Sequence, residues 1–227
     1  METTRKRSLN AQLIALAAAR LVLNTGLRFV YPYAPALARG LNVRREDIYY
    51  LITLRNMTGF LSPIFGPLSE RYGRRAILVT GMVIFAIGAF LVVVRPSYWM
   101  LGIALCATGV AKILYDPAMQ AYVGDEVPYE RRGRAVAITE YSWSLALLVG
   151  VPIVGILIQR QGWQAPFLWL GLGGFVAAFV LWRTISTSER RSSTVTTLGQ
   201  VIQMLREHHV VIFASVYITL FVAANEM

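Results

Sequence analysis

Long apolar stretches constrain this chain more than any other feature. A helix needs about 20 mostly apolar residues to cross the hydrocarbon core of a bilayer, where each backbone polar group must be bonded within the protein. Six stretches reach that length and a seventh begins. They run from Leu9 to Leu37, Ile48 to Leu68, Ala76 to Val94, Tyr98 to Val123, Ala135 to Ile158 and Trp163 to Trp182, with His209 to Met227 opening the next. We therefore predict an all-α integral membrane protein, a bundle of six transmembrane helices plus part of a seventh.

The composition agrees with a chain whose solvent is mostly lipid. Hydrophobic residues make up 56% and charged residues 15%, whereas soluble domains average about 45–50% and about 25%. The net charge of +10 raises the question of nucleic-acid binding. The bases lie in short clusters between the apolar stretches, however, which is the pattern of membrane topology. The expected partner is the lipid bilayer, with no nucleic acid.

The motifs of common membrane-bound hydrolases and of ATP-binding proteins are absent from the sequence. Cys106 is the single cysteine and lies within an apolar stretch, and the two histidines are His208 and His209. The chain contains no HExxH, no GxSxG and no GxxxxGK[ST] motif. We expect neither an enzyme nor a metal or other cofactor, and no ATP-driven transport by this chain alone.

The connections between stretches indicate the domain organisation and the orientation. Residues 1–183 are predicted to form the six-helix bundle, the Ser/Thr-rich 184–208 a cytoplasmic linker, and 209–227 the start of helix 7 in a second bundle. A cytoplasmic N-terminus places 13 bases inside and 5 on the opposite side. The positive-inside rule therefore predicts a multi-pass protein of the inner or plasma membrane with its N-terminus in the cytoplasm.

The chain resembles itself at an offset of 89 residues. Over 14 positions, six residues recur: Pro63, Gly66, Leu68, Arg71, Gly73 and Ala76 match Pro152, Gly155, Leu157, Arg160, Gly162 and Ala165. An odd number of expected helices separates the copies, so they should lie on opposite sides of the membrane. This is the pattern of a three-plus-three inverted repeat, from which transporter halves are built. Coincidence among glycines and prolines at helix ends is the alternative.

The loop after the second stretch carries a specific motif. It has a glycine, a leucine, an acid, an arginine, a glycine and two bases at fixed spacing: Gly66, Leu68, Glu70, Arg71, Gly73, Arg74 and Arg75. This pattern resembles the signature of the major facilitator superfamily. The resemblance implies that they form a cytoplasmic gate in which exchangeable ion pairs latch one conformation. The alternative is that the arginines only set the topology.

Two more segments are similar to the same family. The segment from Pro117 to Ala135 resembles its second cytoplasmic hairpin, and Gly150, Pro152 and Gly155 resemble the helix 5 signature of its exporters. Ordinary helix packing is the alternative reading of these small residues. Proton-coupled exporters of the family usually carry an arginine where this chain has Leu105. Members typically have twelve helices, so the resemblance covers an N-terminal half and implies a second six-helix half as partner.

Polar residues within the apolar stretches are the candidates for a solute or ion pathway, because charges there are costly. Arg20, Asn24 and Arg28 recur at four-residue spacing and share one helix face, as do Lys112 and Asp116. Arg55 lies mid-stretch and Glu140 near the cytoplasmic end of the fifth helix. We expect a basic central cavity for anionic groups, with Asp116 balancing a base and able to take a proton. The alternative is an intrahelical Lys112–Asp116 pair, with Arg28 reaching outward to the membrane surface.

Together these features predict secondary active transport of a small solute by alternating access, coupled to protons or sodium, in an efflux-type member of the family. The alternative is a truncated or non-transporting membrane module that needs a partner half.

Overall fold

The computed structural model describes residues 9–65, 68–186 and 213, apart from the side chains of residues 63, 64 and 70. All regular elements in these ranges are helices, which confirms the all-α prediction for this part of the chain. The chain divides into two compact units, Met1–Arg191 and Ser192–Met227. The predicted linker beyond residue 186 and the start of helix 7 lie outside the described residues, except Phe213.

The first expected span is broken rather than continuous. Helix α1 (Leu9–Arg28) is followed after one residue by α2 (Val30–Leu41), and the two axes differ by 55°. Pro32 has no N–H and therefore cannot donate the backbone hydrogen bond, four residues back, that would continue the helix past Arg28. The span also continues to Leu41, four residues beyond its predicted end.

The second expected span is interrupted as well. Helix α3 (Arg45–Met57) begins three residues before the predicted start, where Asp47 Oδ2 accepts a hydrogen bond from the Arg44 backbone N–H at 2.9 Å. The chain then tightens into the 3₁₀ turn η1 (Thr58–Leu61), followed by α4 (Ser62–Phe65) and α5 (Leu68–Tyr72).

The later spans agree better with their predictions. They are α6 (Arg74–Val94), α7 (Tyr98–Glu126), α10 (Ala165–Thr184) and a composite helix of α8 (Tyr129–Leu145), the π-helical η2 (Ala146–Gly150) and α9 (Val151–Gln161). These four are long and apolar enough to cross a bilayer, and the bent α1–α2 pair would be a fifth. The α3 segment does not meet that criterion within the described residues, so the sixth span stays a prediction.

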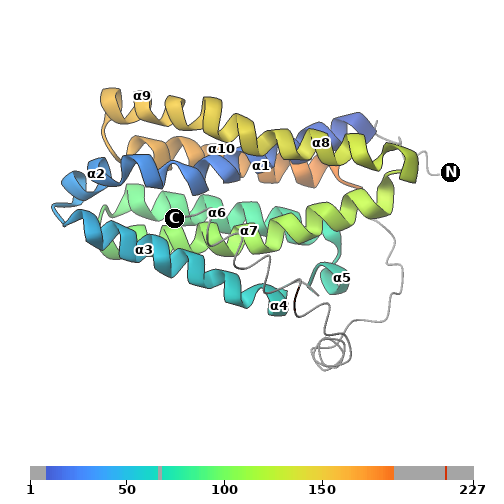
Figure 1. The fold of residues 1–227 in the computed structure, drawn as a ribbon, viewed down its shortest axis with the longest axis horizontal. Helices are drawn as coiled ribbons and strands as arrows, with labels where there is room; N and C mark the ends of the chain where they lie inside the picture. The colour runs from blue at the N-terminus through green and yellow to red at the C-terminus, as the bar shows by residue number, and fades with distance from the viewer. Residues whose placement is uncertain (1–8, 66–67, 187–212, 214–227) are drawn as a thin grey trace. The chain divides into compact units, whose positions relative to one another are not determined.

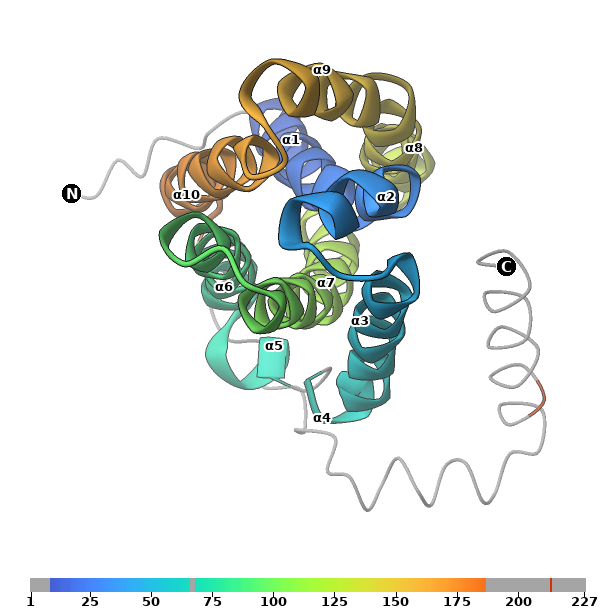
Figure 2. The same cartoon turned by 90° about the vertical axis from the view of Figure 1, so that its left-hand side faces the viewer.

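Close contacts between small residues hold the helices together. Helix α6 packs against α7 and α10, and α1 packs against α10 and α8, an arrangement seen end-on in Figure 2. A Cβ added at Gly81 would lie 3.3 Å from the Ala111 carbonyl oxygen, and one added at Gly174 would lie 3.0 Å from the Ala86 Cβ. Such residues let backbones approach, which is how membrane helices gain packing contacts without a hydrophobic driving force.

The two turn glycines of the sequence repeat share one unusual backbone conformation. Gly73 has φ 89° and Gly162 has φ 91°, a region that side-chain-bearing residues rarely adopt. Gly73 joins α5 to α6 and Gly162 precedes α10, and these turns lie at opposite ends of the helices in Figure 1. This placement agrees with the predicted separation of the two copies. The inverted repeat itself stays a prediction.

Candidate functional site

Arg20 of α1 joins three helices inside the bundle. The residue is 5% exposed. Its Nε lies 3.1 Å from Asp116 Oδ1 on α7, and its Nη1 lies 2.6 Å from Glu140 Oε1 on α8. Nη1 also donates to the Thr139 carbonyl oxygen at 3.1 Å. A guanidinium keeps its charge at any ordinary pH and offers five donors, so several acceptors can be held by this one side chain.

Lys112 extends the same network along α7. Its Nζ lies 2.9 Å from Asp116 Oδ2 and donates to Asn24 Oδ1 at 2.5 Å. The fully buried Asn24 in turn donates to Ser142 Oγ at 3.4 Å. We call Arg20, Asn24, Lys112, Asp116 and Glu140 the polar cluster. The structure thus brings together five of the seven side chains predicted for the pathway.

The charges of the polar cluster balance, with two cations against two carboxylates. Asp116 contacts both cations. These contacts fit the balancing role as well as the intrahelical pairing of the alternative, and the pathway role stays a prediction. Side-chain exposure rises from 6% at Arg20 to 24% at Asp116 and 50% at Glu140. The cluster is therefore anchored in the interior and reaches the surface of the bundle at Glu140.

Arg28 lies beside this cluster, over an aromatic ring. Its guanidinium carbon is 3.9 Å from the ring centroid of Trp143 on α8, and Lys112 Nζ is 5.4 Å from the same centroid. A ring face attracts cations through its quadrupole. Sequence reasoning missed Trp143, although it follows Glu140 by three residues and so shares its face of α8.

Arg55 is not part of the polar cluster. It is 2% exposed and donates to the Leu27 carbonyl oxygen and the Tyr31 hydroxyl, each at 2.8 Å. These partners lie on either side of the break between α1 and α2. The geometry therefore gives Arg55 a contact between helices, apart from the polar cluster, and its predicted place in the pathway stays a prediction.

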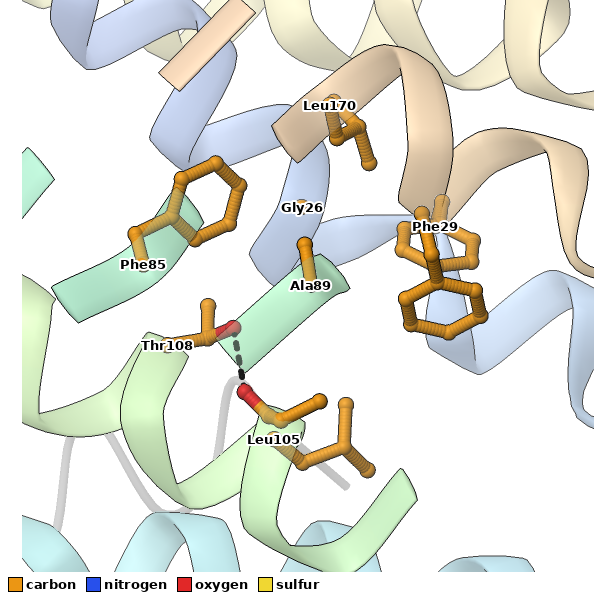
Figure 3. A pocket seen from close by; sticks show the side chains of 9 residues that line it. Gly26, Phe29, Phe85, Ala89, Leu105, Thr108 and Leu170 are labelled. Atoms are coloured by element: carbon orange, nitrogen blue, oxygen red, sulfur yellow. Dashed lines mark hydrogen bonds between the residues drawn. The ribbon is translucent and has the colours of Figure 1, made fainter. Parts of the chain in front are cut away.

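A small apolar cavity lies elsewhere, between α1, α6, α7 and α10. Phe29 and Phe85 border it, and Gly26 forms part of its wall (Figure 3). The Thr108 hydroxyl in the lining donates to the Ala104 carbonyl oxygen at 2.8 Å. The cavity measures about 10 Å³, the lower limit of what one water molecule needs. It is a packing gap, too small for a solute.

The predicted gate motif is only partly described, because Gly66 and the Glu70 side chain lie outside the described part. Arg74 bridges to Asp125 Oδ2 at the end of α7 at 3.2 Å and donates to Ser69 Oγ at 2.5 Å. Arg75 lies 5.5 Å from the Trp182 ring of α10 and Arg71 5.4 Å from the Tyr72 ring. Leu68 packs on the core and Gly73 makes the turn. The motif thus connects α5 and α6 with the ends of α7 and α10.

The helix 5 motif occupies a close crossing with the first span. Gly150 packs against the Thr25 side chain and Gly155 against the Tyr33 hydroxyl, which donates to the Val151 carbonyl oxygen at 3.2 Å. Pro152 lies in the first turn of α9, directly after the π-helical η2. A proline removes a backbone donor, and a π-segment before it is one way in which a helix absorbs the loss.

Comparison with known proteins identifies the family. The model of the Major Facilitator Superfamily matches residues 16–225. The chain belongs to this superfamily. Membership confirms the resemblance that the motif from Gly66 to Arg75 indicated. It also means that the chain is a multi-pass membrane protein. It also supports the expectation that the chain is not an enzyme.

Relatives of the chain are larger transport-related proteins. The chain is 24% identical over 197 residues to Multidrug resistance protein 1 of Bacillus subtilis, covering 86% of this chain and 49% of the relative. It is 31% identical over 139 residues to Probable anion transporter 4, chloroplastic, of Arabidopsis thaliana, covering 60% and 26%. The chain therefore spans about half or less of these relatives.

The fold also matches a solved transporter. The POT family transporter PepTSo, solved in meso, superposes with a TM-score of 0.61 over 80% of this chain and 39% of its own, at 16% identity. At that identity the likeness concerns the fold alone.

Proposed function

We propose that this chain supplies one half of a secondary transporter that moves a small solute across the cell membrane by alternating access. The observation that carries the proposal is the polar cluster. Four charged side chains from α1, α7 and α8 meet inside a membrane-embedded bundle, and such intramembrane charges are kept where they serve a substrate or ion path. A second six-helix half would complete the path around them.

We propose an anionic group on the solute. Arg28 and Lys112 both lie near the Trp143 ring, so two cationic side chains come together at this end of the cluster. Neighbouring cations attract an anionic group. The name of the chloroplastic anion transporter also supports an anionic solute. The name of the multidrug resistance relative supports an efflux role.

The carboxylates of the cluster are the groups through which a coupling ion would act. Protonating Asp116 or Glu140, or binding sodium there, would weaken the hold of the carboxylate on Arg20. The Arg20 guanidinium would then be free to bind the solute. Coupling to a proton or sodium gradient would use this exchange of partners, while the Arg74–Asp125 bridge would latch the cytoplasmic end.

The test measures transport by the protein expressed from the full-length gene, with Arg20→Gln and Lys112→Gln introduced one at a time. Uptake and efflux of small carboxylates and phosphate esters would be followed in membrane vesicles under imposed proton and sodium gradients. Each change removes hydrogen bonds to a charged group, so we expect a fall in transport rate of about tenfold or more.

Arg39→Gln is the matched control, because Arg39 is an exposed arginine in the last turn of α2, outside the polar cluster. Its transport should equal that of the unmodified protein. Unchanged transport in both cluster variants at normal expression would remove the cluster from the pathway. A protein that moves no solute under any gradient would instead favour the alternative of a membrane module without transport of its own.

A further inference from the structure

The break between α1 and α2 needs support from a neighbouring helix. Helices that break within a membrane are tolerated where side chains nearby satisfy the freed backbone groups. Here the axes differ by 55° and Pro32 offers no N–H to the preceding turn. The Leu27 carbonyl belongs to α1 and the Tyr31 hydroxyl to α2, so a side chain that bonds both holds the two sides of the break together.

Arg55 of α3 reaches both of these groups. Its Nη1 donates to the Leu27 carbonyl oxygen and its Nη2 to the Tyr31 hydroxyl, both at 2.8 Å. The guanidinium carbon also lies 5.1 Å from the Tyr31 ring centroid. Asn56 Oδ1 accepts from Nε and Nη2 at 3.2 and 3.0 Å, which fixes the plane of the guanidinium. One side chain thus bridges the two sides of the break.

The backbone of Arg55 is itself held against α7. The Thr58 hydroxyl donates to the Arg55 carbonyl oxygen at 2.6 Å. A Cβ added at Gly109 would lie 3.0 Å from that same oxygen, so α3 and α7 approach as closely as glycine allows. The support for the break is therefore anchored on the helix that also carries Lys112, one turn further along.

The residues of α1 next to the break contact the polar cluster and Trp143. Asn24, three residues before Leu27, bonds to Lys112, and Arg28, the next residue, lies over Trp143. Because a helix is rigid over one turn, moving the Leu27 backbone moves both of these side chains relative to α7 and α8. The place of the break therefore decides how Asn24 and Arg28 meet their partners.

We propose that Arg55 is a positioning residue, which holds the α1–α2 break so that Asn24 and Arg28 face the polar cluster and Trp143. It acts on the solute site through α1 and does not contact the solute. The proposal rests on the proposed transport function for its activity measurement, but its structural claim can be tested independently of transport.

The structural test uses Trp143 as a reporter. The other four tryptophans, Trp99, Trp163, Trp169 and Trp182, are changed to Phe, and acrylamide quenching of Trp143 is measured with and without Arg55→Lys. A lysine keeps the charge but is a point donor that cannot reproduce the planar fork of the guanidinium. If Arg28 leaves one of the two faces of the indole ring, the quenching constant should rise by up to about twofold.

A double-mutant cycle decides whether Arg55 acts through Arg28. In an Arg28→Gln background the ring face is already uncovered, so Arg55→Lys should add no further quenching. Arg39→Lys is the matched control and should leave quenching unchanged. Equal increases with and without Arg28 would overturn the proposal, and so would a Trp143 signal that Arg55→Lys does not alter. Tyr31→Phe removes one partner and should give a smaller change in the same direction.

The activity test separates positioning from a general loss of folded protein. Arg55→Lys should raise the KM for the transported solute several-fold more than it lowers the maximal rate per folded molecule. A lowered amount of folded protein with an unchanged KM would mean that Arg55 only stabilises the helices. If the unmodified protein moves no solute, the proposed function fails, while the quenching cycle still tests the role of Arg55.

Discussion

At the scale of single residues, Asp116 is the side chain that forms ion pairs with both cations of the polar cluster. Its two carboxylate oxygens contact Arg20 at 3.1 Å and Lys112 at 2.9 Å, and it is 24% exposed. Removing one partner from a buried ion pair is far more costly than the net worth of the pair, because the other charge stays buried without compensation. Asp116 compensates two such charges at once.

We therefore expect Asp116→Asn to destabilise the fold by about 3 kcal/mol or more. The midpoint of unfolding by sodium dodecyl sulfate in mixed micelles would measure this. Asp125→Asn is the control. Its bridge to Arg74 is 43% exposed at the carboxylate, and exposed pairs contribute about 1 kcal/mol or less. Equal losses in the two variants would contradict the special position of Asp116.

Helical spacing predicted part of the site at this scale. The four-residue intervals placed Asn24 on the face of Arg20, and Asp116 on the face of Lys112, and the structure joins the two pairs. Spacing cannot say which helix faces which, so it gave no partner for Glu140 and missed Trp143. Spacing likewise gave no partners for Arg55, because an arginine in an apolar stretch carries no sign of its contacts.

At the scale of helices, the contact between α3 and α7 depends on the absence of a side chain. A Cβ at Gly109 would collide with the Thr58 hydroxyl and lie 3.0 Å from the Arg55 carbonyl oxygen. The carbonyl is backbone and cannot rotate away. The helices would have to separate.

Gly109→Ala should therefore destabilise the fold by about 1–3 kcal/mol, the usual range for overpacking. Thermal unfolding in detergent would measure the loss. Gly124→Ala is the matched control on the same helix, since nothing lies within 4 Å of its added Cβ. That variant should be neutral or slightly more stable because alanine is the better helix former. A stable Gly109→Ala variant would mean that α3 and α7 are loosely packed.

The length of an apolar stretch predicted the later helices well, but it did not predict the interruptions in the first two spans. The four later spans follow their apolar stretches closely, because those stretches are long enough to satisfy every backbone bond by themselves. The first span breaks at Phe29, three residues before Pro32, and the second changes to a 3₁₀ turn at Thr58. Both departures involve contacts from other helices, such as the Arg55 bonds, which no local pattern encodes.

At the scale of the whole unit Met1–Arg191, the prediction of orientation depends on the ends of the helices. Arg71 and Arg160 occupy equivalent positions in the predicted repeat, and both are exposed. In Figure 1 the α5 segment and the turn after α9 lie at opposite ends. The positive-inside rule assigns the α5 end to the cytoplasm.

Single cysteines at these two positions, in a Cys106→Ser background, should react differently with an impermeant maleimide. The Arg160→Cys variant should be labelled in intact cells, and the Arg71→Cys variant only after permeabilisation. The unsubstituted Cys106→Ser protein gives the background. Labelling of both cysteines from one side would contradict the inverted repeat as well as the topology.

The equal number of bases and acids in the polar cluster has a consequence for how any ion could pass. Within the polar cluster an incoming ion finds every opposite charge already paired, and it can bind there only by displacing a carboxylate, the guanidinium or the ammonium group from its present partner. The binding free energy of the ion is then the attraction in the new ion pair minus the attraction in the ion pair that it breaks. Such a site favours rapid turnover over tight retention, and each passage must return the displaced group to its original neighbour.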